Sequence, residues 1–60
     1  MMKKYIVQFQ STTCREYEVK ANNEEDAEER ASEAMYDDDT VSKAWYQNAS
    51  TIDIEEVKEN

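Results

Sequence analysis

Carboxylates are the side chains of this sequence that could most readily act in acid–base catalysis, metal binding or the binding of a basic partner. Residues 24–39 hold nine acids and a single base, Arg30, whereas the rest of the chain has six acids and six bases. The whole net charge of −8 therefore belongs to this one segment. Its acids are Glu24, Glu25, Asp26, Glu28, Glu29, Glu33, Asp37, Asp38 and Asp39.

Acid–base catalysis is not indicated by these acids. A catalytic carboxyl pair needs an apolar neighbour that raises the pKa of one member, and no pair in the segment is singled out in that way. The chain has no His and one Cys, so it lacks His-based and Cys–His catalysis, imidazole zinc sites and an internal disulfide. Cys14 has Arg15 beside it but no base partner, and we interpret it as a surface thiol. We expect no enzyme activity, no catalytic residue and no cofactor.

Asp37, Asp38 and Asp39 resemble the start of a calcium-binding loop. An EF-hand loop requires Gly at its sixth position and Glu at its twelfth. Counted from Asp37, these positions hold Ser42 and Asn48. The template fails, and we expect no metal site.

The acidic segment is better suited to binding a protein. A negative helix surface that docks on a basic site of another protein would speed association and could compete with nucleic acid for that site. The low pI of 4.3 argues against direct binding of nucleic acid or of an anionic membrane. The alternative is that the charge only keeps a small protein soluble. The candidate partner-binding residues are Glu25, Glu28, Glu29, Glu33, Asp37, Asp38, Asp39, Trp45 and Tyr46.

A hairpin over residues 3–21 is predicted to carry the core. Residues 3–10 and 15–21 both alternate between apolar and polar side chains, with the polar stretch 11–14 between them. This period of two is typical of half-buried strands, and the short polar break predicts an antiparallel pair.

A helix over about residues 23–37 is predicted next. Asn22 and Asn23 are good N-cap residues, and the acids that follow suit the positive end of the helix dipole. Small residues recur at helical spacing and form an apolar stripe. The stripe consists of Ala27, Ala31, Ala34 and Met35.

The C-terminal part, about residues 42–57, is predicted to be a β segment. Residues 51–57 alternate, with Ile52 and Ile54 facing inward, whereas residues 41–47 are compatible with a strand or with a loop. The expected fold is a single domain over residues 1–60, of class α+β, with two layers in the order β-β-α-(β)-β. The helix stripe should pack on Tyr5, Val7, Phe9, Tyr17, Val19, Ile52 and Ile54.

The face of the sheet without a helix is predicted to associate with a second copy. Ile6 and Gln8 lie on that face, and an exposed aliphatic residue is favourable there only if something covers it. A homodimer through this face or through an edge strand would supplement a small core. The lone Cys and the lack of long apolar runs indicate a cytoplasmic protein without a signal or membrane segment.

The run KYIVQFQ…REYEVKANNEEDAEERASEAMYDDD, followed by STIDIEEV, resembles the small DpnD/PcfM-like proteins and related short proteins of phages and mobile elements. The shared pattern is a hairpin ending in V-x-A, an acidic helix and a closing β segment, and the stretch WYQN has no clear counterpart in it. The resemblance implies a phage-like origin, in which a small acidic protein binds and modulates a host protein, in some cases by imitating the charge of DNA.

Overall fold

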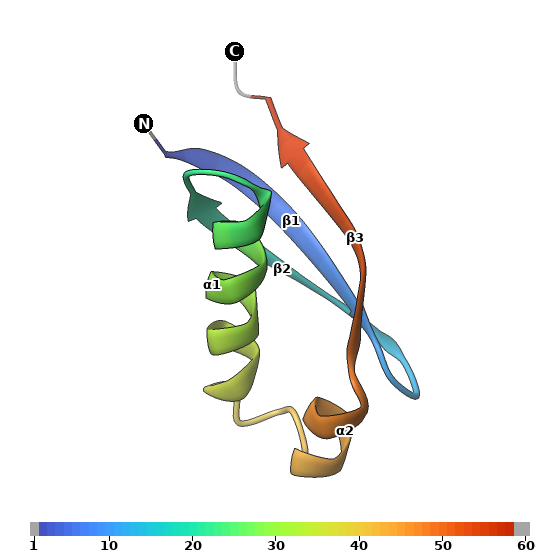
Figure 1. The fold of residues 1–60 in the computed structure, drawn as a ribbon. Coiled ribbons are helices and arrows are strands. Elements are labelled where there is room, and N and C mark those ends of the chain that lie inside the picture. Colours follow the sequence, from blue (N-terminus) through green and yellow to red (C-terminus); the bar gives the residue numbers. More distant parts are fainter. Residues whose placement is uncertain (1, 59–60) are drawn as a thin grey trace.

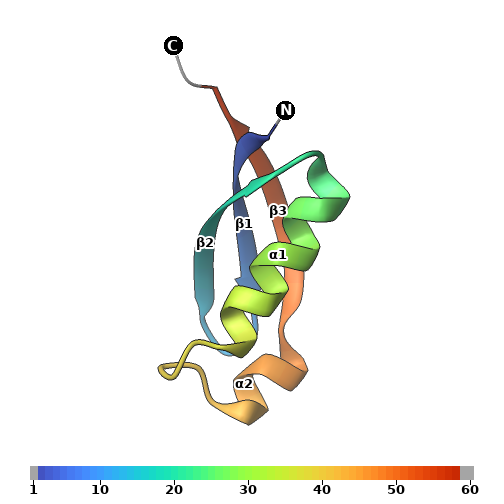
Figure 2. The same ribbon diagram turned by 90° about the vertical axis from the view of Figure 1, so that its left-hand side faces the viewer.

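Three antiparallel strands form one sheet in the order β2-β1-β3, and the main helix lies across one of its faces (Figures 1 and 2). The computed structural model describes residues 2–58. The predicted α+β fold with a β-β-α-β arrangement is confirmed. The elements are β1 (Lys3–Gln10), β2 (Cys14–Ala21), α1 (Glu24–Tyr36), α2 (Lys43–Asn48) and β3 (Ser50–Val57).

The central strand β1 supplies the middle of the core. Tyr5, Val7 and Phe9 are buried beneath α1, while the alternate residues of β1 face the other side of the sheet and are only half-buried or exposed. β2 pairs with β1 over its full length, from Lys3 opposite Ala21 to Gln10 opposite Cys14. This alternation follows directly from the period of two in the sequence.

The start of α1 is held by the side chains of Asn23 and Asp26. The Asn23 side chain accepts a hydrogen bond from the Asp26 N–H (2.8 Å), and Asp26 in turn accepts from the Asn22 N–H (3.0 Å). Asp26 also pairs with Arg30 one turn later (3.1 Å). The Asn22 N–H bond and the Arg30 guanidinium lower the pKa of Asp26. Of the two N-cap candidates in the sequence, Asn22 and Asn23, the structure uses Asn23.

The apolar stripe of α1 is narrower than the sequence predicts. Ala27, Ala31 and Met35 are buried against the sheet, but Ala34 is exposed. Glu28 and Ser32 lie on the flank of α1 that faces β3. With about 100° of rotation per residue, Ala34 lies on the opposite flank, at the margin of the stripe. The prediction that Ala34 is buried was wrong for this reason.

Residues 43–48 form a short helix, α2, and not the β structure or loop that we expected. Ser42 caps this helix by accepting a hydrogen bond from the Trp45 N–H (3.1 Å). Trp45, on α2, is buried and closes the end of the core.

Strand β3 contains a bulge, which overturns the prediction that Ile52 faces inward. Gln8 pairs with Asp53 and Phe9 pairs with Thr51, so Ile52 is an extra residue with no partner on β1. After this bulge Ile54 lies opposite Val7 and packs against the core, whereas Ile52 is 47% exposed. The expectation that Ile52 faces inward was wrong because the bulge shifts the register by one residue.

The turns of the chain use no left-handed backbone. Among residues 2–58 no residue has a positive φ, and α1 ends on Asp37 in an ordinary right-handed conformation. The absence of Gly from the sequence therefore imposes no backbone strain on these turns.

Candidate functional site

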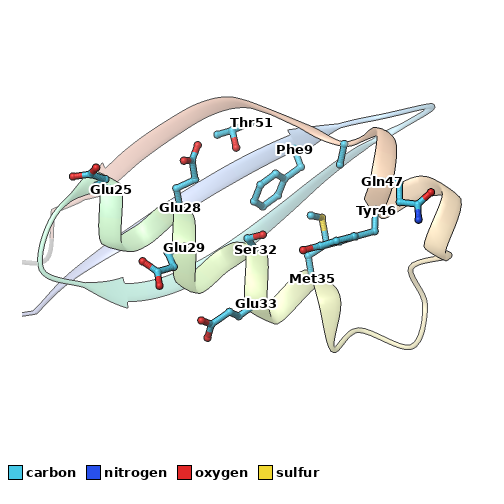
Figure 3. A pocket seen from close by; sticks show the side chains of 11 residues that line it. Phe9, Glu25, Glu28, Glu29, Ser32, Glu33, Met35, Tyr46, Gln47 and Thr51 are labelled. Carbon is cyan, nitrogen blue, oxygen red and sulfur yellow. The ribbon is translucent and has the colours of Figure 1, made fainter.

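An open groove of about 620 Å³ runs between α1 and β3 (Figure 3). α1 packs more extensively on β2 than on β3, and the groove lies along the flank of α1 beside β3. The groove is lined by Phe9, Glu25, Glu28, Glu29, Ser32, Glu33, Met35, Tyr46, Gln47, Ala49 and Thr51. We call it the acidic groove.

One wall of the acidic groove is a row of glutamates from α1. Glu25, Glu28, Glu29 and Glu33 are all exposed, and none of them makes an ion pair or side-chain hydrogen bond within residues 2–58. Glu28 extends toward β3, whereas Glu29 and Glu33 point away from the sheet (Figure 3). The four predicted glutamates thus form one row, but they do not face the groove equally.

The rest of the lining is partly apolar. Phe9 and Met35 are buried core residues whose surfaces reach the groove. Tyr46, which belongs to α2, lines one end of the groove (Figure 3). Tyr46 packs edge-on against Tyr36, with ring centroids 5.3 Å apart, and Tyr36 is 65% exposed. Carboxylates beside apolar surface suit a ligand that carries both positive charge and an apolar group.

The three consecutive aspartates that we predicted to bind a partner have different environments. Asp37 and Asp39 are exposed, but Asp38 is half-buried and is held by three hydrogen bonds from two residues. It accepts hydrogen bonds from the Thr40 Oγ1 (2.6 Å), the Thr40 N–H (2.9 Å) and the Tyr17 hydroxyl (2.7 Å). These bonds, with the nearby Arg15 guanidinium, lower the pKa of Asp38 to about 2. Asp38 is therefore a structural carboxylate of the loop between α1 and α2, because its hydrogen bonds are made within the chain.

Trp45 also makes its contacts within the fold. Its ring is only 9% exposed, and its indole N–H donates to the Thr13 hydroxyl of the hairpin loop (3.1 Å). The Arg15 guanidinium lies 5.5 Å from the ring centroid and donates to Thr40 Oγ1 (3.0 Å) and to the Thr40 carbonyl (3.1 Å). Of the two aromatic candidates, Trp45 is a core anchor, and Tyr46 is the one that borders the acidic groove.

Sequence reasoning missed this network around Arg15. A usable signal was present, because the alternation of β2 places Arg15 on the same face as Tyr17 and Val19. A cation on the apolar face of a strand needs a partner, and Asp38 supplies one at 3.7 Å. The groove residues Thr51 and Gln47 were also missed, since their positions depend on the bulge of β3 and on α2.

Ile6 and Gln8 lie at the centre of the face without a helix. Ile6 is half-buried, and its partners across the sheet are Glu18 on β2 and Glu55 on β3. Gln8 lies between Glu16 and Asp53 in the same way. The two residues directly opposite Ile6 on the neighbouring strands are thus both carboxylates.

Metal chemistry finds no support in the part of the chain that the structure describes. No group of three or more His, Cys, Asp or Glu residues within 2–58 is arranged to hold a metal ion. Cys14 is an exposed free thiol at the start of β2. None of the helices described is both long and apolar enough to cross a membrane.

Comparison of the chain with known protein families, with curated proteins and with solved structures found no match. The acidic groove is therefore interpreted from its own residues.

Proposed function

We propose that this chain is a small interaction protein that binds a basic segment of another protein in the acidic groove. The observation that carries the proposal is a row of glutamates that have no ion pair within residues 2–58 and lie along a groove with apolar lining. Charge that served solubility alone would not need to border such a groove. The proposal involves no catalytic step, cofactor or metal.

Each part of the groove has a role in this proposal. Glu25 and Glu28 pair with Lys or Arg side chains of the partner, while Glu29 and Glu33 attract it from a distance. Tyr46 contacts an apolar side chain of the partner next to Phe9 and Met35, since aromatic residues are frequent interface anchors. Asp37 and Asp39 extend the negative surface beyond the groove.

The resemblance to DpnD/PcfM-like proteins adds a biological setting to the proposal. In that setting the chain is encoded by a phage or mobile element and acts in the cytoplasm of the host. Its partner is a host protein with a basic surface, which the chain modulates or inhibits by covering that surface. If the surface normally binds nucleic acid, the acidic groove acts as a mimic of DNA charge without binding nucleic acid itself.

The competing function is an accessory homodimer whose acidity serves only solubility. The two functions differ in what the groove does. The interaction protein requires the apolar lining and the glutamates together, whereas the solubility explanation assigns the groove no ligand at all.

A titration with two synthetic peptides tests the proposal. Both are short and lysine-rich; one has a single central leucine, and in the other serine replaces that leucine. We expect the leucine peptide to bind more tightly and to shift the backbone amide NMR signals of Ser32, Gln47 and Thr51. Equal affinity for both peptides, or signal shifts spread over the whole acidic surface, would show nonspecific charge attraction and contradict the proposal.

A further inference from the structure

The two edge strands of the sheet differ in how they are protected from pairing with another strand. Edge strands expose unpaired backbone groups, and proteins commonly blunt them with bulges and with charged side chains. β3 has both devices, namely the bulge at Ile52 and the acids Asp53, Glu55 and Glu56. A second β3 placed beside it would set acids against acids.

Strand β2 has no bulge, and its charged side chains are of both signs. Its register with β1 is uninterrupted over eight residues. Its face toward α1 carries Tyr17 and Val19, which pack against the core but are only half-buried. Its other face carries charges of both signs, including Glu18 and Lys20, each of which is exposed. This edge is regular, partly apolar and of mixed charge.

We propose that two copies of this chain pair antiparallel through β2, about a two-fold axis at Val19. The axis is perpendicular to the sheet, so that residues opposite each other lie on the same face and both α1 helices cover one side. Val19 then lies opposite Val19 of the partner subunit, and Tyr17 lies opposite Ala21 of the partner subunit. On the other face, Glu18 lies opposite Lys20 of the partner subunit, twice by symmetry.

Charge selects this register over its neighbours. An axis at Glu18 would place that carboxylate against its own copy, and an axis at Tyr17 would place Glu16 against Glu18 of the partner subunit. An axis at Lys20 would place the two lysines against each other. Only the axis at Val19 pairs opposite charges next to the centre, and like charges directly opposite in a sheet are destabilising.

The distribution of charge on α1 is compatible with this dimer. Glu28 extends toward β3, which becomes the outer strand of each subunit, and Glu29 and Glu33 point away from the sheet. The flank on the β2 side carries the exposed Ala34 and the Asp26–Arg30 ion pair, so it is the less acidic one. Two acidic grooves stay open at the ends of a six-stranded sheet, and the dimer does not depend on what those grooves bind.

Sedimentation equilibrium over a range of concentrations at 150 mM salt tests the proposal. The wild-type chain should approach twice its mass of 7.1 kDa as concentration rises. Glu18→Lys and Lys20→Glu should each weaken the dimer by about tenfold or more, because each places two like charges opposite one another. Glu16→Lys, which makes the same charge change outside the paired region, should leave the dimer intact.

Mixing the two disruptive variants is the decisive experiment for this dimer. Glu18→Lys and Lys20→Glu subunits are complementary to each other, so an equimolar mixture should form heterodimers at concentrations where each variant alone is monomeric. Circular dichroism shows that each variant is folded. A wild-type chain that stays monomeric, or a mixture that forms no heterodimer, would overturn the proposal.

Discussion

The Tyr17 hydroxyl donates a hydrogen bond to Asp38 Oδ2 at 2.7 Å and thereby ties strand β2 to the loop between α1 and α2. The same carboxylate accepts two bonds from Thr40 and lies beside Arg15. The loop with three consecutive aspartates is therefore anchored through its middle residue. This anchor holds α2, and with it Tyr46, at the end of the acidic groove.

Asp38→Asn should lower the melting temperature by several degrees at neutral pH, and the loss should depend on pH. The folded pKa of Asp38, about 2, lies below its usual value of 3.8, so the unfolded chain binds the proton more readily. The stabilisation is fully present above about pH 4 and disappears as the pH falls toward 2. Thermal melts of both proteins from pH 2 to pH 7 should show the gap closing at the acidic end. A gap that is constant over this range would show that the carboxylate charge is not involved.

Tyr17 should respond at the alkaline end of the pH range. Burial, together with the hydrogen bond to Asp38, raises the pKa of Tyr17 above 10.0. Its stabilising effect is thus present below pH 10 and is lost as the pH rises through the folded pKa, because the unfolded chain gives up the proton first. Tyr17→Phe should flatten this alkaline loss, and thermal melts between pH 9 and 11 measure the difference. An unchanged alkaline loss in Tyr17→Phe would contradict the bond.

Two alanines one turn apart should tolerate arginine very differently. Ala31 is fully buried between α1 and the sheet, so Ala31→Arg should cost about 3 kcal/mol or more and unfold a domain of this size. Ala34→Arg adds the same side chain at an exposed position and should change stability by no more than about 0.5 kcal/mol. Urea unfolding followed by circular dichroism measures both. Similar stability of the two variants would mean that α1 does not pack as described.

The two isoleucines of β3 provide a test of the bulge. Ile54 packs on the core opposite Val7, so Ile54→Thr should cost about 1–2 kcal/mol. Ile52 is half exposed and unpaired with β1, so Ile52→Thr should cost less than about 0.5 kcal/mol. Urea unfolding gives both values. The reverse order of the two losses would place Ile52 in the core and remove the bulge.

Local patterns were enough to predict most of the fold. The alternation in Tyr5, Val7 and Phe9 identified a strand because strand periodicity needs no knowledge of its neighbours. The Asn23 cap likewise depends on residues within one turn of it. Features that depend on pairing were not predictable in this way. The exposure of Ile52 follows from the register between β1 and β3, and α2 is too short, at six residues, to show a helical period.

The candidate site shows the same division between local and long-range information. The glutamates of α1 were recognisable as one row, since helix periodicity places them on the surface. The groove itself was not, because it forms between α1, α2 and β3, which only the folded chain brings together. The role of Asp38 was missed because Tyr17 is 21 residues away in sequence.

The binding of basic ligands in the acidic groove is tested most directly by a comparison of two double variants of α1. Glu25→Lys/Glu28→Lys and Glu29→Lys/Glu33→Lys change the net charge equally, but only the first pair includes Glu28, which extends toward β3. Both should keep the fold, since all four positions are exposed and each new lysine has a remaining acid one helical turn away. The measurement is the affinity for the leucine-containing lysine peptide at 50 and 150 mM salt.

We predict that the first double variant loses about tenfold or more in affinity, and that the second loses about threefold through weaker long-range attraction alone. The loss in the second variant should shrink at the higher salt concentration, where exposed charges are screened. Equal losses in the two variants at both salt concentrations would contradict the claim that the groove, and not the total charge of the helix, binds the ligand.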